Sequence, residues 1–121
     1  MEARMAGEIV HIEFPCKDVD RGQAFWGGLF GWQFGESAMP GMDYRMAQTG
    51  EGSGAAVLEA PPGQPVYYYD TPDIEAAMAK VGELGGKAGD KTPVPTHGWL
   101  SHCTDSEGNA FSLWQSDPSA G

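Results

Sequence analysis

Residues 9–15, IVHIEFP, alternate between two sets of side chains, as a β-strand with one buried face does. The apolar set contains Val10, Ile12 and Phe14 and predicts the core side of a strand over about residues 8–14. The opposite side carries His11 and Glu13, an imidazole next to a carboxylate. Because a solvated strand face more often carries Thr, Lys or Gln, this pair indicates either a wet face or the wall of a site.

The remaining pattern predicts two similar series of elements. In the first, Asp18 or Asp20 caps a helix that runs to about Leu29, and Gly31 ends it. Further strands are predicted near 32–34, 42–48 and 54–60. After the stiff, proline-rich junction at 60–65, the second series predicts a strand over 66–70, a helix over 72–84, a loop at KTPVP, and strands over 98–104 and 110–115.

A shift of 55 residues places the second series on the first. It aligns Phe14 with Tyr69, Asp18 with Asp73, Leu29 with Leu84, and Tyr44 with Trp99. Each copy has the element order βαβββ, with module one at about 7–60 and module two at about 64–117. The sequence therefore predicts a single α+β domain over residues 1–121, in which two βαβββ modules form a curled mixed sheet around a central cavity.

Charge, hydropathy and cysteine spacing indicate which partners, cellular compartment and thiol state to expect. The net charge of −10 opposes binding to nucleic acid or to an anionic membrane. No apolar run reaches the roughly 20 residues that cross a bilayer, so we expect a cytoplasmic protein. Cys16 and Cys103 lie far apart without a CxxC pair, which predicts two free thiols.

Three segments resemble the vicinal oxygen chelate superfamily, which includes glyoxalase I, extradiol dioxygenases, and bleomycin and fosfomycin resistance proteins. They are HIEFPCKDVDRGQAFWGGLFGWQF, VYYYDTPDIEAAMAKVGELGG and DSEGNAFSLWQ, and the similarity extends from about Ile9 to Gln115. The resemblance implies a glyoxalase-like protein. Metalloenzymes of this group hold one divalent ion with four inward-facing ligands from the first and last strands of the two modules.

The ligand positions implied by the resemblance are incompletely filled. His11 matches the first-strand position, whereas its counterpart Val66 cannot bind a metal. Where relatives have GNxxEL this chain has GNAFSL, which places Ser112 at the position of a carboxylate; the fourth position is Val57 or Glu59. His97 and His102 lie outside the family positions. We therefore expect no metal cofactor, and only His11 and Glu59 as ligands if a divalent metal binds.

Strand parity then predicts a mostly apolar and aromatic cavity wall with a few polar groups, as in small-molecule pockets. Its predicted ligand-binding residues are His11, Glu13, Tyr44, Met46, Val57, Glu59, Val66, Tyr68, Trp99, Ser101, Ser112 and Trp114. This composition favours a hydrophobic or aromatic ligand that is neutral or basic.

We expect a small-molecule-binding protein of the glyoxalase and bleomycin-resistance type with a degenerate metal site. One alternative is a divalent-metal-dependent lyase, isomerase or dioxygenase. Another is a non-catalytic structural or interaction protein whose cavity is filled by side chains. We also expect a homodimer, because a small chain gains from further burial; the junction permits pairing of modules within a chain or by exchange between chains.

Overall fold

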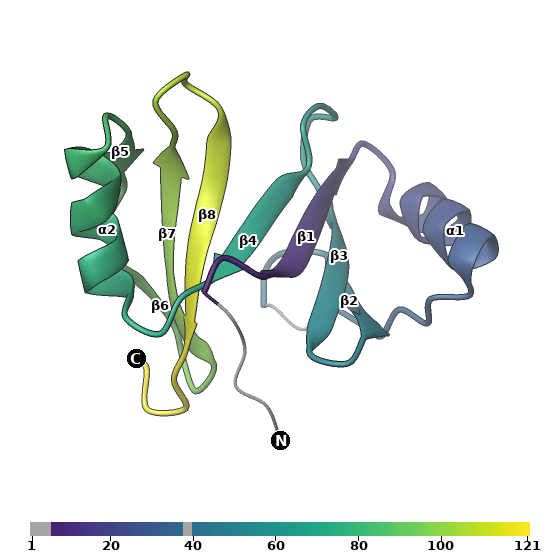
Figure 1. The fold of residues 1–121 in the computed structure, drawn as a ribbon. Coiled ribbons are helices and arrows are strands. Elements are labelled where there is room, and N and C mark those ends of the chain that lie inside the picture. Colours follow the sequence, from purple (N-terminus) through teal and green to yellow (C-terminus); the bar gives the residue numbers. More distant parts are fainter. Residues whose placement is uncertain (1–5, 38–39) are drawn as a thin grey trace. The chain divides into compact units, whose positions relative to one another are not determined.

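The computed structural model describes residues 6–37 and 40–121, and the chain divides into two compact units (Figure 1). The N-terminal unit contains residues 10–66. The C-terminal unit contains residues 67–121 together with the described residues up to Ile9. The boundary follows directly after the proline-rich junction that the sequence predicts at 60–65.

The N-terminal unit is built from β1 (Ile9–Cys16), α1 (Val19–Phe30), β2 (Tyr44–Gly50) and β3 (Ser53–Glu59). Its strands lie in the order β2–β3–β1, with β3 antiparallel to β2 and parallel to β1. β3 is therefore the central strand of this unit, and β1 and β2 contact each other only across it.

Local chemistry fixes both ends of α1 and its contact with the sheet. A carboxylate oxygen of Asp18 accepts a hydrogen bond from the Arg21 backbone N–H at 3.1 Å, which caps the first turn. Gly31 ends the helix with a φ of 74°, a conformation that glycine adopts without strain. On the sheet side, Trp26 stacks on Phe14 with ring centroids 4.3 Å apart.

The C-terminal unit is built from β4 (Val66–Asp70), α2 (Ile74–Glu83), β5 (Lys87–Ala88), β6 (Thr92–Val94), β7 (Gly98–Thr104) and β8 (Ala110–Ser116). Its strands lie in the order β4–β8–β7–β5, and β6 also pairs with β7. β4 is parallel to β8, whereas β7 is antiparallel to β8, β5 and β6.

α2 covers one face of this second sheet, next to β7 and β8 in Figure 1. The Asp73 carboxylate caps its first turn by accepting from the Ala76 N–H at 3.1 Å. Ile74 of α2 forms a buried cluster with Cys103 of β7 and Leu113 of β8. The two caps, Asp18 and Asp73, are the pair that the 55-residue repeat aligns.

The predicted α+β class with mixed strand directions is confirmed. Two predicted details are wrong. Residues 32–34 form no strand, because the 31–35 segment makes only one described backbone hydrogen bond to β2, from Gly35 N–H to Met46 O. The Trp32 side chain packs against Trp26 and Phe30. The KTPVP segment, predicted as a loop, contributes β6. Among the described residues, no helix has the length and apolar character needed to cross a membrane.

The two aspartate caps predict a specific loss of stability. Asp18→Ala and Asp73→Ala should each lower the free energy of unfolding by about 1 kcal/mol, because each leaves a first-turn N–H without its acceptor. Urea unfolding followed by circular dichroism measures this loss. Glu83→Ala, at the exposed far end of α2, is the control and should change stability by less than about 0.5 kcal/mol. Equal losses in all three variants would contradict the assigned caps.

Gly98 predicts a steric effect. A Cβ atom there would lie 2.3 Å from the Gln115 carbonyl oxygen and 2.6 Å from Trp114 Cζ2, so β7 and β8 would have to separate. Gly98→Ala should therefore cost about 1–3 kcal/mol of unfolding free energy. Gly82→Ala is the control, because a Cβ at that position of α2 meets nothing within 4 Å, and it should be neutral or stabilising by up to about 1 kcal/mol. A neutral Gly98→Ala would show that the strands do not approach this closely.

Candidate functional site

The two sets of side chains on β1 lie on opposite faces of the N-terminal sheet. Phe14 and Cys16 face α1: Phe14 stacks on Trp26, and Cys16 lies so close to Gly22 that a Cβ there would be 2.4 Å from its sulfur. His11 has the opposite parity and lies on the sheet face away from α1. We call this the helix-free face of the N-terminal unit.

Three polar side chains of this face form one hydrogen-bonded chain. His11 Nε2 lies 2.8 Å from the Tyr44 hydroxyl, and that hydroxyl donates to Glu13 Oε2 at 2.6 Å. His11 and Glu13 come from β1, whereas Tyr44 is the first residue of β2. The phenol of Tyr44 thus reaches over β3, on the same face of the sheet, and joins the imidazole to the carboxylate. We name this arrangement the His11–Tyr44–Glu13 chain.

Small residues on the central strand make this contact possible. Gly54 pairs with His11, and Ala56 pairs with Glu13, so β3 presents little side-chain volume between β1 and β2. A Cβ atom at Gly54 would already lie 3.5 Å from His11 Nδ1 and 3.2 Å from the Ala47 carbonyl oxygen. Because β3 carries only a glycine and an alanine on this face here, the long side chain of Tyr44 can reach across it to β1.

The hydrogen-bond directions define the protonation of the chain. A carboxylate is an acceptor only, so Tyr44 donates its single proton to Glu13. His11 then donates to the phenol oxygen from Nε2, which assigns the Nε2–H tautomer and makes Nδ1 the acceptor of the ring. Burial lowers the pKa of His11, and the Glu13 charge opposes this shift only in part. The imidazole is therefore neutral near pH 7.

The other predicted site residues of this unit separate between the two faces. Met46 pairs with Ala56, shares the helix-free face and is 47% exposed. Val57 and Glu59 were predicted on the same wall, and that placement is wrong. Val57 pairs with Phe14 and is fully buried on the α1 side, and Glu59 pairs with Cys16, which also faces α1. The residue of β3 between them, Leu58, has the parity of the helix-free face.

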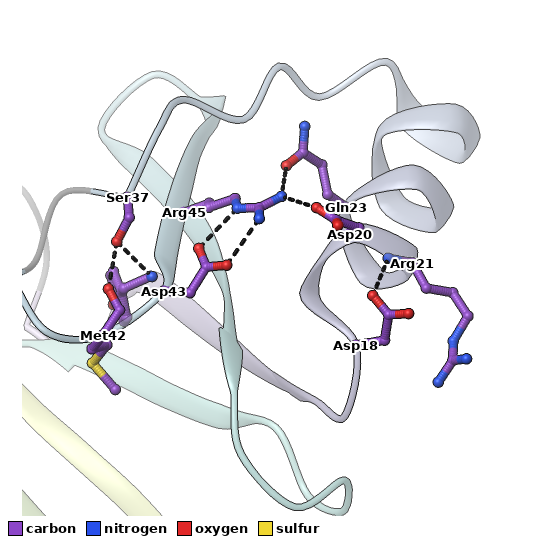
Figure 2. A network of polar contacts seen from close by, with 9 residues as sticks. Asp18, Asp20, Arg21, Gln23, Ser37, Met42, Asp43 and Arg45 are labelled. Atoms are coloured by element: carbon purple, nitrogen blue, oxygen red, sulfur yellow. Dashed lines mark hydrogen bonds and ion pairs between the residues drawn. The ribbon is translucent and has the colours of Figure 1, made fainter.

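Glu59 instead borders an open groove of about 510 Å³ beside the start of α1. Arg45 lines this groove. Its guanidinium binds Asp43 with two hydrogen bonds of 2.9 Å and donates at 2.8 Å to both Asp20 and Gln23 (Figure 2). Hydrogen bonds to Asp43 and then to Asp20 raise the pKa of Arg45. With four donors so engaged, Arg45 serves to tie β2 to α1. The groove is lined by Lys17, Asp18, Val19, Asp20, Arg21, Asp43, Arg45 and Glu59.

In the C-terminal unit, Tyr68 and Ser112 are paired and lie on the sheet face away from α2, as predicted from parity. Ser112 is fully buried, and its hydroxyl lies 2.7 Å from His102 Nδ1. Tyr68 meets the same imidazole edge-on, with ring centroids 6.1 Å apart. Trp114 has the parity of Ser112, and Val66 is the first residue of β4, with an apolar side chain that has no ligating atom.

Trp99 and Ser101 were predicted on this face and lie on the other. Trp99 packs against the cluster under α2 and donates from Nε1 to Asp117 at 3.0 Å. Ser101 is fully buried and donates to the Gly89 carbonyl oxygen at 3.0 Å. The alternate residue, His102, occupies the face that these two were expected to line.

The sequence contained a signal that would have identified His102. The shift of 55 residues holds for the first strand and the helix of each copy, but the last two strands require a shift of 56. Gly52 and Gly108, each with a positive φ in the turn between the paired strands, are 56 residues apart. A shift of 56 aligns Met46 with His102, whereas a shift of 55 aligns Tyr44 with Trp99. Because Met46 lies on the face away from α1, the shift of 56 predicts that His102 lies on the face away from α2.

These positions do not fit a divalent metal centre of the family type. Val66 has no donor atom, Ser112 is hydrogen-bonded to His102, and Glu59 faces α1. Within residues 6–37 and 40–121, no group of three or more His, Cys, Asp or Glu side chains could hold a metal ion. We therefore assign no chemical step to a metal at His11.

Comparison with known proteins agrees with this architecture. A family model described as a glyoxalase-like domain matches residues 10–114. A glyoxylase-like domain-containing protein of Didymella fabae is 31% identical over 90 residues, which are 67% of this chain and 70% of that protein.

Solved structures show the same fold at low sequence identity. A hypothetical protein from Bacillus halodurans C-125 has a TM-score of 0.73 at 17% identity, covering 97% of this chain and 99% of that one. Methylmalonyl-CoA epimerase from Mycobacterium tuberculosis has a TM-score of 0.72 at 12% identity, covering 98% and 94%. A Streptomyces coelicolor methylmalonyl-CoA epimerase in complex with 2-nitronate-propionyl-CoA has a TM-score of 0.68 at 16% identity, covering 97% and 99%.

The length of the family match carries the assignment, because it includes α1, β2 and β3 of the N-terminal unit and everything from β4 to β7 in the C-terminal unit. The structural neighbours add that the fold itself is that of glyoxalase-type proteins. This chain therefore belongs to the glyoxalase-like domain family, within the vicinal oxygen chelate superfamily.

Proposed function

We propose that the protein binds a small organic molecule on the helix-free face of the N-terminal unit, without a metal ion held by the family positions. The observation that carries this proposal is the His11–Tyr44–Glu13 chain. Its polar atoms are fixed in place by one another and lie on a sheet face that α1 does not cover. Pre-oriented donors and acceptors of this kind are what give a small-molecule site its specificity.

The chemistry of the chain favours a particular class of ligand. A neutral imidazole and a phenol can accept or donate hydrogen bonds, and the Glu13 carboxylate attracts a donor or a cation. Met46 and Leu58 supply apolar surface on the same face. We therefore propose a ligand with a hydrophobic or aromatic body and a neutral or cationic polar group. The net charge of −10 further disfavours anions.

The relatives support small-molecule binding on this fold without identifying the ligand. One neighbour is a methylmalonyl-CoA epimerase in complex with methylmalonyl-CoA, at 16% identity and a TM-score of 0.68. Methylmalonyl-CoA is the ligand of that epimerase, and we do not propose it as the ligand of this chain. We propose that this chain binds its small-molecule ligand in the cytoplasm. Because of the net charge of −10, we propose no binding to nucleic acid or to an anionic membrane.

The neutral state of His11 predicts a pH dependence of stability. Burial lowers the pKa of His11 in the folded protein, so the unfolded chain binds the proton more readily below about pH 6.5. The stability contributed by the neutral ring should be complete above about pH 6.5 and should be lost as the pH falls. Urea unfolding between about pH 7.5 and 5 should show a smaller loss in His11→Gln than in the wild type.

His97→Gln provides the control for this measurement, because that ring lies in the exposed turn before β7. It should keep the pH dependence of the wild type. If His11→Gln and His97→Gln lose stability with falling pH to the same extent, the imidazole of His11 is not held neutral by the fold.

The ligand class is tested with naphthalene derivatives that carry an ammonium, a hydroxyl or a carboxylate group. Calorimetry should show binding of the first two and weaker or no binding of the carboxylate. Tyr44→Phe should weaken binding about tenfold, roughly 1.4 kcal/mol, because the phenol oxygen connects His11 to Glu13.

Glu59→Gln is the matched control, since this carboxylate lies on the α1 side, and it should leave the affinity unchanged. Preferential binding of the carboxylate compound, or loss of binding in Glu59→Gln but not in Tyr44→Phe, would overturn the proposed site. Stoichiometric Zn, Ni, Fe or Mn in the purified protein, found by elemental analysis, would instead favour the metal-dependent lyase, isomerase or dioxygenase. A protein that binds none of the three compounds would favour the non-catalytic interaction protein.

A further inference from the structure

Tyr44, which joins the two polar groups of β1, lies at the end of an edge strand. It is the first residue of β2, and in the described part of the chain β3 is the only strand that pairs with β2. The end of an edge strand opens more readily than the middle of a sheet, because fewer backbone hydrogen bonds hold it. The position of the Tyr44 backbone therefore depends on contacts outside the pairing of β2 with β3.

Ser37 binds the backbone of β2 at this residue. The Tyr44 N–H donates to Ser37 Oγ at 2.9 Å, and the same hydroxyl donates to the Met42 carbonyl oxygen at 2.6 Å (Figure 2). Further along the same edge, the Gly35 N–H donates to the Met46 carbonyl oxygen at 3.0 Å. One hydroxyl thus uses its proton and an acceptor lone pair to fix the backbone on both sides of residue 43.

The residues directly before and after Tyr44 bind each other on the other face of the strand. The Arg45 guanidinium donates to both carboxylate oxygens of Asp43 at 2.9 Å, once from Nε and once from Nη2. A bidentate pair fixes direction as well as distance. Because the two partners are two positions apart, this pair holds the backbone extended through Tyr44 and directs the phenol to the helix-free face.

The same guanidinium connects the pair to α1. Its Nη1 atom donates at 2.8 Å to Asp20 in the first turn of the helix and at 2.8 Å to Gln23, three residues further along. These partners leave only 21% of the Arg45 side chain exposed. Because α1 packs on the sheet of this unit, Arg45 ties the start of β2 to a rigid element.

The second copy of the repeat forms the equivalent strand without such an ion pair. The shift of 56 that aligns the last two strands of each copy matches Tyr44 with Leu100. The residues on either side of Leu100 are Trp99 and Ser101, which carry no charge. The strand therefore forms without a charged pair where its inner residue is apolar, and the pair is present where that residue is a phenol in a polar chain.

We propose that Ser37, Asp43 and Arg45 are positioning residues of the ligand site, which act through the Tyr44 phenol rather than by touching the ligand. Their effect on binding rests on the proposed function, whereas the placement of the phenol is a property of the protein without ligand. When the phenol is displaced, the Nε2–H of His11 loses its acceptor, and the tautomer of the ring is no longer fixed.

Nitrogen NMR of the imidazoles tests the placement without any ligand. At about pH 8, long-range ¹H–¹⁵N correlations of the wild type should show His11 as the Nε2–H tautomer, and His11→Gln identifies its signals. Arg45→Met should shift both ring nitrogens towards a tautomer mixture, in the same direction as Tyr44→Phe. Lys91→Met is the matched control, because it removes an ion pair of the same 2.8 Å length, with Glu75 in the C-terminal unit, and it should leave the His11 signals unchanged.

Calorimetry with the hydroxyl derivative of naphthalene measures the effect on binding. Arg45→Met should weaken binding about five- to tenfold, and Lys91→Met should leave it unchanged. Arg45→Lys should recover only part of the loss, because an ammonium group cannot form the two parallel hydrogen bonds to Asp43. Ser37→Ala should weaken binding roughly threefold, and Ser37→Thr, which keeps the hydroxyl, should restore the affinity of the wild type.

The two measurements separate this proposal from the proposed function. Unchanged His11 signals in Arg45→Met, beside a clear shift in Tyr44→Phe, would overturn the positioning role. Equal losses of affinity in Arg45→Met and Lys91→Met would also overturn it, since they would reflect a general loss of stability. A wild type that binds none of the naphthalene compounds would contradict the proposed function, and the His11 signals would still decide whether Arg45 positions the phenol. Circular dichroism verifies folding, and Arg45→Lys gives the same comparison if Arg45→Met does not fold.

Discussion

The register of β3 against its two neighbours decides which side chains of the N-terminal unit can meet. Pairing of Gly54 with His11 and of Ala56 with Glu13 leaves the middle of the helix-free face almost without side-chain volume. Across that gap the phenol of Tyr44 reaches both polar groups of β1. A shift of β3 by one residue would place Ala55 and Val57 there instead and would direct the small residues towards α1.

Elements and caps could be predicted well from the sequence, because each rests on local chemistry. The alternation in IVHIEFP, the aspartates before each helix and the glycine after α1 act within a few residues. The face of a strand is harder to predict, since a single inserted residue reverses it. The copies differ in spacing by one residue before their last two strands, and this difference moved Trp99 and Ser101 to the wrong side and left His102 out.

The misplaced residues of β3 have a different cause. Val57 and Glu59 were placed on the cavity wall by strand parity and matched to the fourth ligand position through the resemblance to metalloenzymes, which could be fitted to this strand only within a small shift. In the structure Val57 fills the space under α1, and the fully buried Ala55 and Ala56 beside it keep that strand closely packed. The His11–Tyr44–Glu13 chain could not have been predicted in full, because it depends on contacts between residues more than 30 positions apart.

The position of Tyr44 on one face of β2 depends on the contacts of Arg45 on the other face. Arg45, bound to Asp43, Asp20 and Gln23, anchors this edge strand to the beginning of α1, and Tyr44 is its immediate neighbour on the other face. The position of the Tyr44 phenol thus depends on the ion pairs of Arg45, which a ligand on the helix-free face would not contact. Substitutions on the surface beside α1 can therefore displace the Tyr44 phenol, and a comparison limited to residues of the helix-free face would overlook them.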